Sequence, residues 1–409
     1  MPLTGNIKKD DYRWLIVIAG CLCIFACIGL GRFTLGMILP SMSDDLGFSY
    51  SEMGFIGTAN FIGYLSSVVV SGFLVRLFGA RLVITAALVC VGASIILLGF
   101  SKDFVSATVL YTVTGFGSGA SNIPMMALVA KWFVRHQRGR AAGFIVMGSG
   151  FAIILSGKLI PYINEHCGAM GWRINWWIVG SMVLLIALFC LLLLRNSPED
   201  VGGSRVEDTG DQSQKRRLLL IKDPFAYYLG LVYFIFGFTY VIYVTFIVTL
   251  LVKERGVAEN IAGNFWSYLG LLSLISGPLF GTLSDRIGRD KALGLVFFSQ
   301  SLSYILVAAG GSDLSVYLSI IFFGIVAWSI PSIMAALVGD VYGADRTPAV
   351  FGFVTFIFGL GQVAGPAIAG LIAEKSGTLS YSFILAFLFS ALAVWLSLRI
   401  KKEMLRFET

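Results

Sequence analysis

The feature that most constrains this chain is an apolar run of about 20 residues that recurs along its length. A helix of about 20 apolar residues spans the hydrocarbon core of a bilayer, which is about 30 Å thick. The composition agrees, since 57% of the 409 residues are hydrophobic and only 13% are charged, against about 25% charged in soluble domains. Transmembrane strands would instead alternate over about 10 residues. The chain is therefore predicted to be an all-α polytopic membrane protein.

Counting these runs predicts twelve transmembrane helices. Their expected ranges are 14–40, 51–75, 80–100, 104–132, 139–163, 172–195, 223–252, 259–286, 291–309, 313–341, 347–374 and 379–400. One long polar linker, 196–222, divides them. We therefore expect an N-terminal six-helix bundle over 1–195 and a C-terminal six-helix bundle over 223–409.

The basic residues are distributed unevenly around these helices. If both termini are cytoplasmic, 23 of the 30 Lys and Arg fall in cytoplasmic segments and 5 fall outside. An excess of Lys and Arg marks cytoplasmic loops, so the bias predicts this orientation. It also explains the formal charge of +7 without a nucleic-acid partner. We expect a multi-pass protein of the plasma membrane, which is the inner membrane in a Gram-negative cell.

The two halves of the chain repeat one another. "GFLVRLFGAR" begins at Gly72 and "GTLSDRIGRD" begins at Gly281, while "ALVAKWFVRHQRGRAAG" begins at Ala127 and "ALVGDVYGADRTPAVFG" begins at Ala336. Both pairs are 209 positions apart. Parallel repeats of this kind are typical of transporters, whose substrate site lies where the halves meet.

These motifs resemble the major facilitator superfamily of secondary transporters over the whole chain. The superfamily's loop signature, G-x-L-a-D-R-x-G-R-R/K, is matched by Gly281, Leu283, Asp285, Arg286, Gly288 and Arg289. The segment "KWFVRHQRGRAAGFIVMGSG" (131–150) is similar to the corresponding part of monocarboxylate and oxalate/formate transporters. The resemblance implies two pseudo-symmetric six-helix bundles and transport by alternating access.

The resemblance also implies a gate on the cytoplasmic side. Asp285 can pair with nearby arginines and hold that side shut, so Asp285, Arg286 and Arg289 are the expected gating residues. The first half departs from the pattern, because Arg76 replaces the family's Asp and Tyr111 replaces its helix-4 Arg.

Arg32 is the first candidate for substrate binding. It lies inside an apolar run with no nearby acid, at a cost of at least about 2.5–3.5 kcal/mol on insertion scales. The guanidinium either snorkels to the outer interface along its alkyl stem or faces a central cavity as a fixed cation. Arg32 precedes Pro40 by eight positions, and this spacing resembles helix 1 of the organophosphate/phosphate antiporters, where the arginine binds the anion.

The acidic residues favour an anionic substrate. All 23 Asp and Glu can be placed in loops, tails or helix ends, whereas cation antiporters of the superfamily usually need a carboxylate within a span. Arginine holds a carboxylate through parallel hydrogen bonds, and one buried cation suits one negative charge. Helix 259–286 lacks the arginine that monocarboxylate carriers place there, so Arg32 would have to bind the anion from the other half.

Further polar residues within spans are candidates to complete the site. Asn122 ranks first among the amides because it lies beside Pro124, which frees a backbone carbonyl. Tyr240 and Tyr243 can donate hydroxyl hydrogen bonds. Each candidate can instead join helices by an interhelical hydrogen bond. The remaining candidates are Asn60, Asn264, Tyr268, Trp328 and Gln362.

The sequence thus predicts a transporter of a small organic anion, a monocarboxylate in the first instance, driven by proton symport or by anion exchange. An exporter of neutral or amphipathic molecules, with a cavity lined by some of the 33 Phe and 11 Met, is the alternative. No cofactor, metal or enzymatic activity is expected. The expected partners are the substrate, protons and the lipid bilayer, and we expect a monomer.

Overall fold

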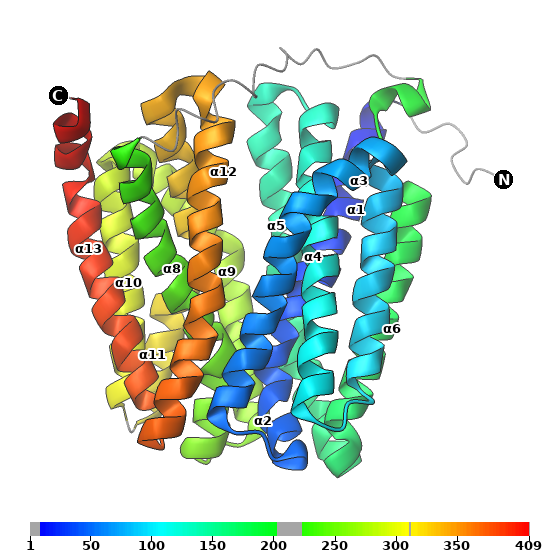
Figure 1. The fold of residues 1–409 in the computed structure, drawn as a ribbon, viewed down its shortest axis with the longest axis vertical. Helices are drawn as coiled ribbons and strands as arrows, with labels where there is room; N and C mark the ends of the chain where they lie inside the picture. The colour runs from blue at the N-terminus through cyan, green and yellow to red at the C-terminus, as the bar shows by residue number, and fades with distance from the viewer. Residues whose placement is uncertain (1–8, 203–222, 311, 409) are drawn as a thin grey trace. The chain divides into compact units, whose positions relative to one another are not determined.

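The computed structural model describes residues 9–202, 223–310 and 312–408, and within these ranges the chain forms helices without any strand (Figure 1). The chain divides into two compact units. Of the described residues, 9–38 and 59–202 form the first unit, and 39–58, 223–310 and 312–408 form the second.

The helices of the first part of the chain run without long connections. They are α1 (Lys9–Ile24), the π-helix η1 (Phe25–Phe33), α2 (Thr34–Leu46), α3 (Tyr50–Leu98), α4 (Phe104–Trp132), α5 (Arg135–Cys167), the 3₁₀ turn η2 (Gly168–Met170), α6 (Gly171–Leu193) and the 3₁₀ turn η3 (Pro198–Val201).

The remaining helices lie in the later part of the chain. They are α8 (Pro224–Thr249), the π-helix η4 (Leu250–Glu254), α9 (Glu259–Ile287), α10 (Arg289–Ala309), α11 (Asp313–Gly324), α12 (Ser329–Ser376) and α13 (Ser380–Glu408).

Nine stretches of the described residues are long and apolar enough to cross a membrane. Two of them, Tyr50–Leu98 with 49 residues and Gln137–Leu193 with 57, are long enough to cross twice at about 20 residues per crossing. The 29-residue α4 also has the length of a crossing, although its Gly and Ser residues make it less apolar. Together these stretches account for the twelve predicted crossings.

The internal repeat has a structural counterpart at two glycines. Gly79 interrupts α3 with φ 77° and ψ 157°, and Gly288, between α9 and α10, has φ 95° and ψ 148°. These conformations strain any residue with a Cβ atom. The two glycines are 209 positions apart, so both halves reverse direction at the same point of the repeat with the same backbone geometry.

Three predicted helices differ in form from the structure, and of these the helix 223–252 differs only at its end, where it continues into the π-helix η4. The first is helical from Lys9 to Leu46, but residues 25–33 are π-helical. The predicted helix 313–341 is broken, because α11 ends at Gly324 and a turn over 325–328 precedes α12. An apolar pattern shows that a segment spans the membrane but not where its backbone hydrogen bonds change from i→i+4 to i→i+5.

Residues 39–58 group with the second unit, although they lie within the predicted N-terminal bundle. Lys253 on η4 lies 2.8 Å from the Asp44 carboxylate, and Thr58 donates a hydrogen bond of 2.8 Å to the Val363 carbonyl. A Cβ atom on Gly54 would lie 2.3 Å from the Pro366 carbonyl oxygen. Close backbone contact therefore attaches the first residues of α3, up to Thr58, to α12, and the Lys253–Asp44 pair attaches the end of α2 to η4.

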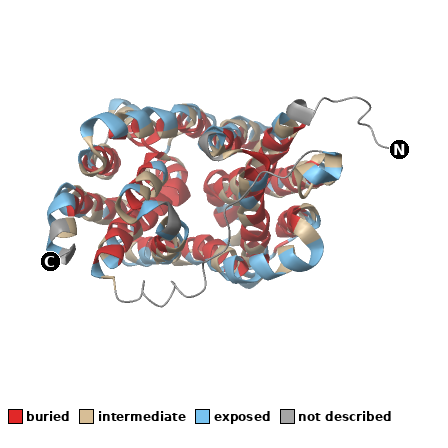
Figure 2. Cartoon of the chain, turned by 90° about the horizontal axis from the view of Figure 1, so that it is seen from above, coloured by how far each residue is buried: buried red, intermediate tan, exposed pale blue. Residues whose placement is uncertain are grey.

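Burial follows the expectation for helices surrounded by lipid. Within each unit the buried residues line the inside of the helix group and exposed residues lie outside (Figure 2). Many of the exposed residues are apolar, with Val69 81% and Phe73 62% exposed. Such surfaces are unfavourable in water, and hydrocarbon is the solvent that accommodates them.

Candidate substrate-binding site

Arg32 lies near the end of the π-helix η1, which packs closely against α4 and α5. A Cβ atom on Gly29 would lie 2.2 Å from the Cβ of Ala152 on α5. Ser118 on α4 donates a hydrogen bond of 2.7 Å to the Cys27 carbonyl. Small residues therefore let η1 approach its neighbours, and side-chain donors bond the carbonyls of its irregular backbone. π-Helical turns often occur at functional sites.

Three residues of α3 surround the Arg32 side chain. Its Nε donates to Asn60 Oδ1 at 3.4 Å, and its Cζ lies 4.5 Å from the ring centres of both Phe61 and Tyr64. Cation–π contacts of this kind contribute about 0.5–2 kcal/mol, depending on solvation. Asn60 and Tyr64 are one helical turn apart and share a face, so α3 fixes the guanidinium from one side.

One terminal nitrogen of Arg32 remains unsatisfied. Nη2 is buried and has no hydrogen-bond partner, and no carboxylate pairs with Arg32 among the residues that the structure describes. A buried donor without a partner costs about 1–3 kcal/mol, and more when it is charged. This result favours the fixed cation over the snorkelling side chain, because snorkelling would place the terminal nitrogens in water.

A second layer of hydrogen bonds holds this arrangement. The Tyr111 hydroxyl donates to the Arg32 carbonyl at 2.8 Å, and Asn60 Nδ2 donates to the Tyr111 carbonyl at 3.3 Å. Asn122 Nδ2 donates to the Tyr64 hydroxyl at 2.8 Å. The sequence-predicted residues Arg32, Asn60 and Asn122 therefore belong to one cluster within the first unit, which we call the Arg32 cluster and which also includes Phe61, Tyr64 and Tyr111.

Phe61 and Tyr64 were not among the sequence candidates, and Tyr111 was noted only as a departure from the family pattern. Aromatic residues are frequent throughout the chain, so their count carries no signal. The available signal was the spacing of Asn60 and Tyr64, which places a second polar side chain one turn after the amide.

The second unit brings together three other predicted residues. Gln362 on α12 donates to the Tyr240 hydroxyl on α8. The Tyr240 ring makes an edge contact with Trp328, with centres 5.9 Å apart. Trp328 lies in the turn between α11 and α12, so the break in that helix positions the indole.

The other predicted residues of this unit lie in different surroundings. Tyr243 is fully buried, and its hydroxyl lies 2.9 Å from Ser319 Oγ, which in turn lies 2.9 Å from Ser303 Oγ. Tyr268 on α9 is 50% exposed. Asn264, one helical turn before Tyr268 on α9, is half-buried.

Two of the three predicted gating residues, Asp285 and Arg289, form a charged cluster with Asp340, which we call the Arg289 cluster. Arg289 pairs with Asp285 and lies 2.9 Å from the Asp340 carboxylate on α12. Its Nη1 also donates to Ser284 at 2.6 Å. Arg286 is exposed. Arg289 therefore joins α9, α10 and α12. The loop signature alone does not identify Asp340 as a partner of Arg289.

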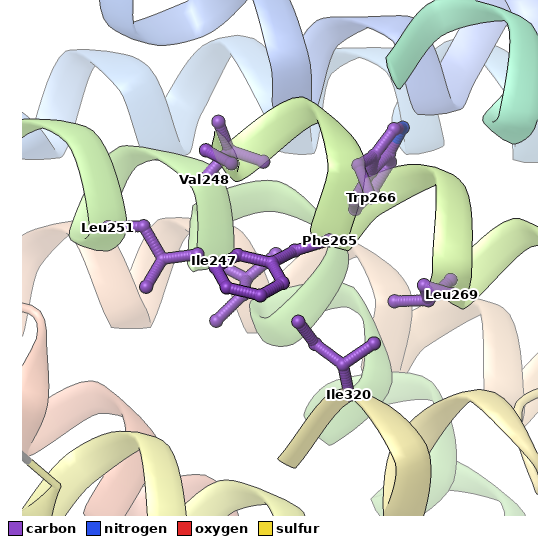
Figure 3. Close-up of a pocket in the computed structure, with 8 residues that line it drawn as sticks. Ile247, Val248, Leu251, Phe265, Trp266, Leu269 and Ile320 are labelled. Atoms are coloured by element: carbon purple, nitrogen blue, oxygen red, sulfur yellow. The ribbon is translucent and has the colours of Figure 1, made fainter. Parts of the chain in front are cut away.

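A small pocket in the second unit has no polar lining suited to an anion (Figure 3). It is lined by Ile247, Val248, Leu251, Ala262, Phe265, Trp266, Leu269 and Ile320, which come from α8, η4, α9 and α11. None of the predicted substrate-binding residues lines it. The described residues also contain no cluster of His, Cys, Asp or Glu suited to a metal ion.

Comparison with known proteins identifies the relatives of this chain. Residues 24–398 match the family model described as "Uncharacterised MFS-type transporter YbfB". The hexuronate transporter of Bacillus subtilis (strain 168) is 24% identical over 91% of this chain and 90% of its own length. Human monocarboxylate transporter 2 is 24% identical over 85% of this chain and 77% of its own length.

The fold has counterparts among solved structures. The crystal structure of a bacterial homolog of the human lysosomal transporter Spinster, in an inward-facing and unoccupied conformation, superposes with a TM-score of 0.77. It covers 97% of this chain and 98% of its own, at 14% identity. The predicted fold class and the predicted resemblance to monocarboxylate carriers are confirmed by these matches.

Proposed function

Because this chain belongs to the MFS-type YbfB family of membrane transporters, we propose that its substrate is a small organic anion with one negative charge, a monocarboxylate. The Arg32 cluster binds the carboxylate, and alternating access of two six-helix bundles moves it across the membrane. The relatives support this substrate class, since a hexuronate transporter and a monocarboxylate transporter, both named for organic acids, are among them.

One observation carries the proposal. The Nη2 atom of Arg32 is buried without a partner and no acid neutralises the guanidinium among the described contacts. A carboxylate bound by Nη1 and Nη2 satisfies that donor and neutralises the charge. Because the cluster holds a single cation, a monoanion leaves no net charge, whereas a dianion leaves a second negative charge unpaired.

Coupling and topology complete the proposal. We propose that transport is driven by a proton entering with the acid or by exchange against another anion. Both termini are proposed to be cytoplasmic, the Arg289 cluster is proposed to close the cytoplasmic side in one state, and the monomer is the proposed transport unit. Tyr240, Trp328 and Gln362 are proposed as further substrate-binding residues.

The test is uptake into proteoliposomes that contain the purified protein. Labelled propionate, lactate, succinate, a phosphate ester, a quaternary ammonium ion and a neutral amphiphile are compared, with and without an inward proton gradient. Arg32→Gln is expected to abolish monocarboxylate uptake, and Arg32→Lys to retain part of it, because a lysine keeps the charge but loses the parallel hydrogen bonds. Arg76→Gln, at an exposed position of the same unit, is the matched control.

Two outcomes would contradict the proposal. Equal monocarboxylate uptake by wild type and Arg32→Gln would show that the guanidinium does not bind the substrate. Uptake of the neutral amphiphile alone would favour the exporter of neutral compounds. A gradient that accelerates uptake supports proton symport, and acceleration by internal anion supports exchange.

A further inference from the structure

The Tyr64–Asn122 pair of the Arg32 cluster has hydrogen-bonding capacity that the protein does not use. Asn122 donates to the Tyr64 hydroxyl oxygen at 2.8 Å. In that bond Tyr64 acts as acceptor, so its own hydroxyl hydrogen is available, as is the Asn122 carbonyl oxygen. No described residue accepts from the former or donates to the latter.

This unused pair lies directly beside the charged group. The Tyr64 ring that carries the hydroxyl is the same ring whose centre lies 4.5 Å from the Arg32 Cζ. A carboxylate held by the Arg32 nitrogens therefore has the Tyr64 hydroxyl as a neighbour. The tyrosine side chain as a whole is only half-buried.

We propose that Tyr64 and Asn122 determine specificity by binding a hydroxyl group on the substrate carbon next to the carboxylate. The Tyr64 hydroxyl donates to the substrate hydroxyl oxygen, and the Asn122 carbonyl oxygen accepts the substrate hydroxyl hydrogen. This inference rests on the proposed function, because it requires a carboxylate at Arg32. It selects among carboxylates, and 2-hydroxy acids are favoured over acids that lack the hydroxyl.

The physical basis of this selectivity is the cost of unmet hydrogen bonds. A polar pair that gives up water to bind an alkyl group loses hydrogen bonds without replacement, whereas a substrate hydroxyl restores both. Sites built around a substrate hydroxyl therefore discriminate strongly against analogues that lack it. For one neutral pair we expect about a tenfold preference, which corresponds to roughly 1.4 kcal/mol.

The inference is tested with matched pairs of acids. Binding to the purified full-length protein is measured by ligand-induced thermal stabilisation, with lactate against propionate and 2-hydroxybutyrate against butyrate. Wild type is expected to prefer the 2-hydroxy member of each pair about tenfold. Tyr64→Phe keeps the aromatic ring over Arg32 and removes the hydroxyl, so it is expected to bind both members with the affinity of the deoxy acid.

Further variants separate specificity from a general loss of structure. Asn122→Leu removes the acceptor and is expected to reduce the same preference. Tyr162→Phe, at a position that is 61% exposed in the same unit, controls for loss of a tyrosine hydroxyl elsewhere and should leave the preference unchanged. If Tyr64→Phe does not fold, Asn122→Leu alone still tests the prediction.

The possible failures differ from one another. Equal binding of hydroxy and deoxy acids by wild type overturns the inference and leaves the carboxylate proposal intact. If both Tyr64→Phe and Asn122→Leu keep the wild-type preference for the 2-hydroxy acid, other residues cause that preference. This result also overturns the inference. Binding of neither acid, together with binding of a neutral amphiphile, overturns the proposed function and the inference with it.

Discussion

The Tyr111 hydroxyl donates a hydrogen bond of 2.8 Å to the backbone carbonyl of Arg32, the residue 79 positions earlier in the chain. The bond joins α4 to the π-helix η1 at the residue that carries the charge. Tyr111 therefore positions Arg32 through its backbone, while the α3 residues Asn60 and Tyr64 contact its side chain.

Removing this hydroxyl is expected to weaken substrate binding as well as stability. Tyr111→Phe should lower the free energy of unfolding by about 1 kcal/mol, the value of one buried hydrogen bond, and raise the KM for monocarboxylate uptake several-fold. Thermal unfolding in detergent and uptake kinetics measure both. Tyr12→Phe is the matched control, because Tyr12 donates an equivalent bond of 2.8 Å to the Leu193 carbonyl. Equal KM values for the two variants would show that Tyr111 is structural only.

The contact between α3 and α4 depends on the absence of a side chain at Gly115. A Cβ atom there would lie 1.9 Å from the Asn60 carbonyl oxygen. Gly115→Ala is therefore expected to destabilise the protein by about 1–3 kcal/mol and to reduce uptake, since it displaces the amide that contacts Arg32. Gly143→Ala, where a Cβ atom meets no atom within 4 Å, should be neutral or stabilising by up to about 1 kcal/mol. Unchanged stability and unchanged uptake in Gly115→Ala would show that α3 and α4 do not pack this closely at Gly115.

The two tyrosines of α8 are expected to respond differently to loss of their hydroxyls. Tyr243→Phe breaks a buried chain with Ser319 and Ser303 and should reduce stability by about 1 kcal/mol with uptake per folded molecule unchanged. Tyr240→Phe removes the acceptor of Gln362 and should raise the KM for monocarboxylates. Uptake normalised to folded protein separates the two effects, and a raised KM in Tyr243→Phe would contradict the assignment.

The charged cluster around Arg289 is expected to control the rate of transport. The Arg289 side chain is 20% exposed, whereas those of Asp285 and Asp340 are 60% and 58% exposed. Such partly exposed pairs are worth about 0.2–1 kcal/mol and weaken with salt. A double-mutant cycle of Arg289→Gln with Asp340→Asn should give a coupling in that range in the uptake rate, declining with ionic strength. Arg286→Gln is the exposed control, and an equal effect of Arg286→Gln would place the latch elsewhere.

The topology can be tested with a native cysteine. Cys167 is exposed at the end of α5, whereas Cys23, Cys27 and Cys190 are buried. With both termini cytoplasmic, five crossings place Cys167 outside. A membrane-impermeant maleimide should therefore label wild type in right-side-out vesicles but not Cys167→Ser. Labelling that requires permeabilised vesicles would reverse the orientation.

The membrane fold could be predicted from the sequence because hydrocarbon imposes a length of about 20 apolar residues on each span. The repeat at Gly72 and Gly281 likewise needed only pattern and spacing. The candidate site was harder to predict from the sequence. Arg32 was found because a charge in an apolar run is costly, but its aromatic neighbours Phe61 and Tyr64 are ordinary residues for a membrane helix. Only packing shows which of many aromatic rings contacts the guanidinium.

The same limit applies to Tyr240 and Tyr243. The sequence predicts the same role, hydroxyl hydrogen bonding, for both tyrosines, yet Tyr240 bonds to α12 and Tyr243 bonds to α11. Their partners come from helices far apart in sequence, and a single sequence carries no record of those contacts.

The π-helix η1 has a consequence for comparing this chain with its relatives. A π-turn accommodates one more residue than an α-turn over the same stretch, so η1 is equivalent to an insertion within residues 25–33. An alignment fixed at Pro40 against a relative with a regular α-helix will therefore shift the residues that precede η1 by one position and onto a different helix face. Arg32 lies at the end of η1 that is nearer to Pro40, so it is shifted least, and a gap in the first helix should be allowed before Arg32.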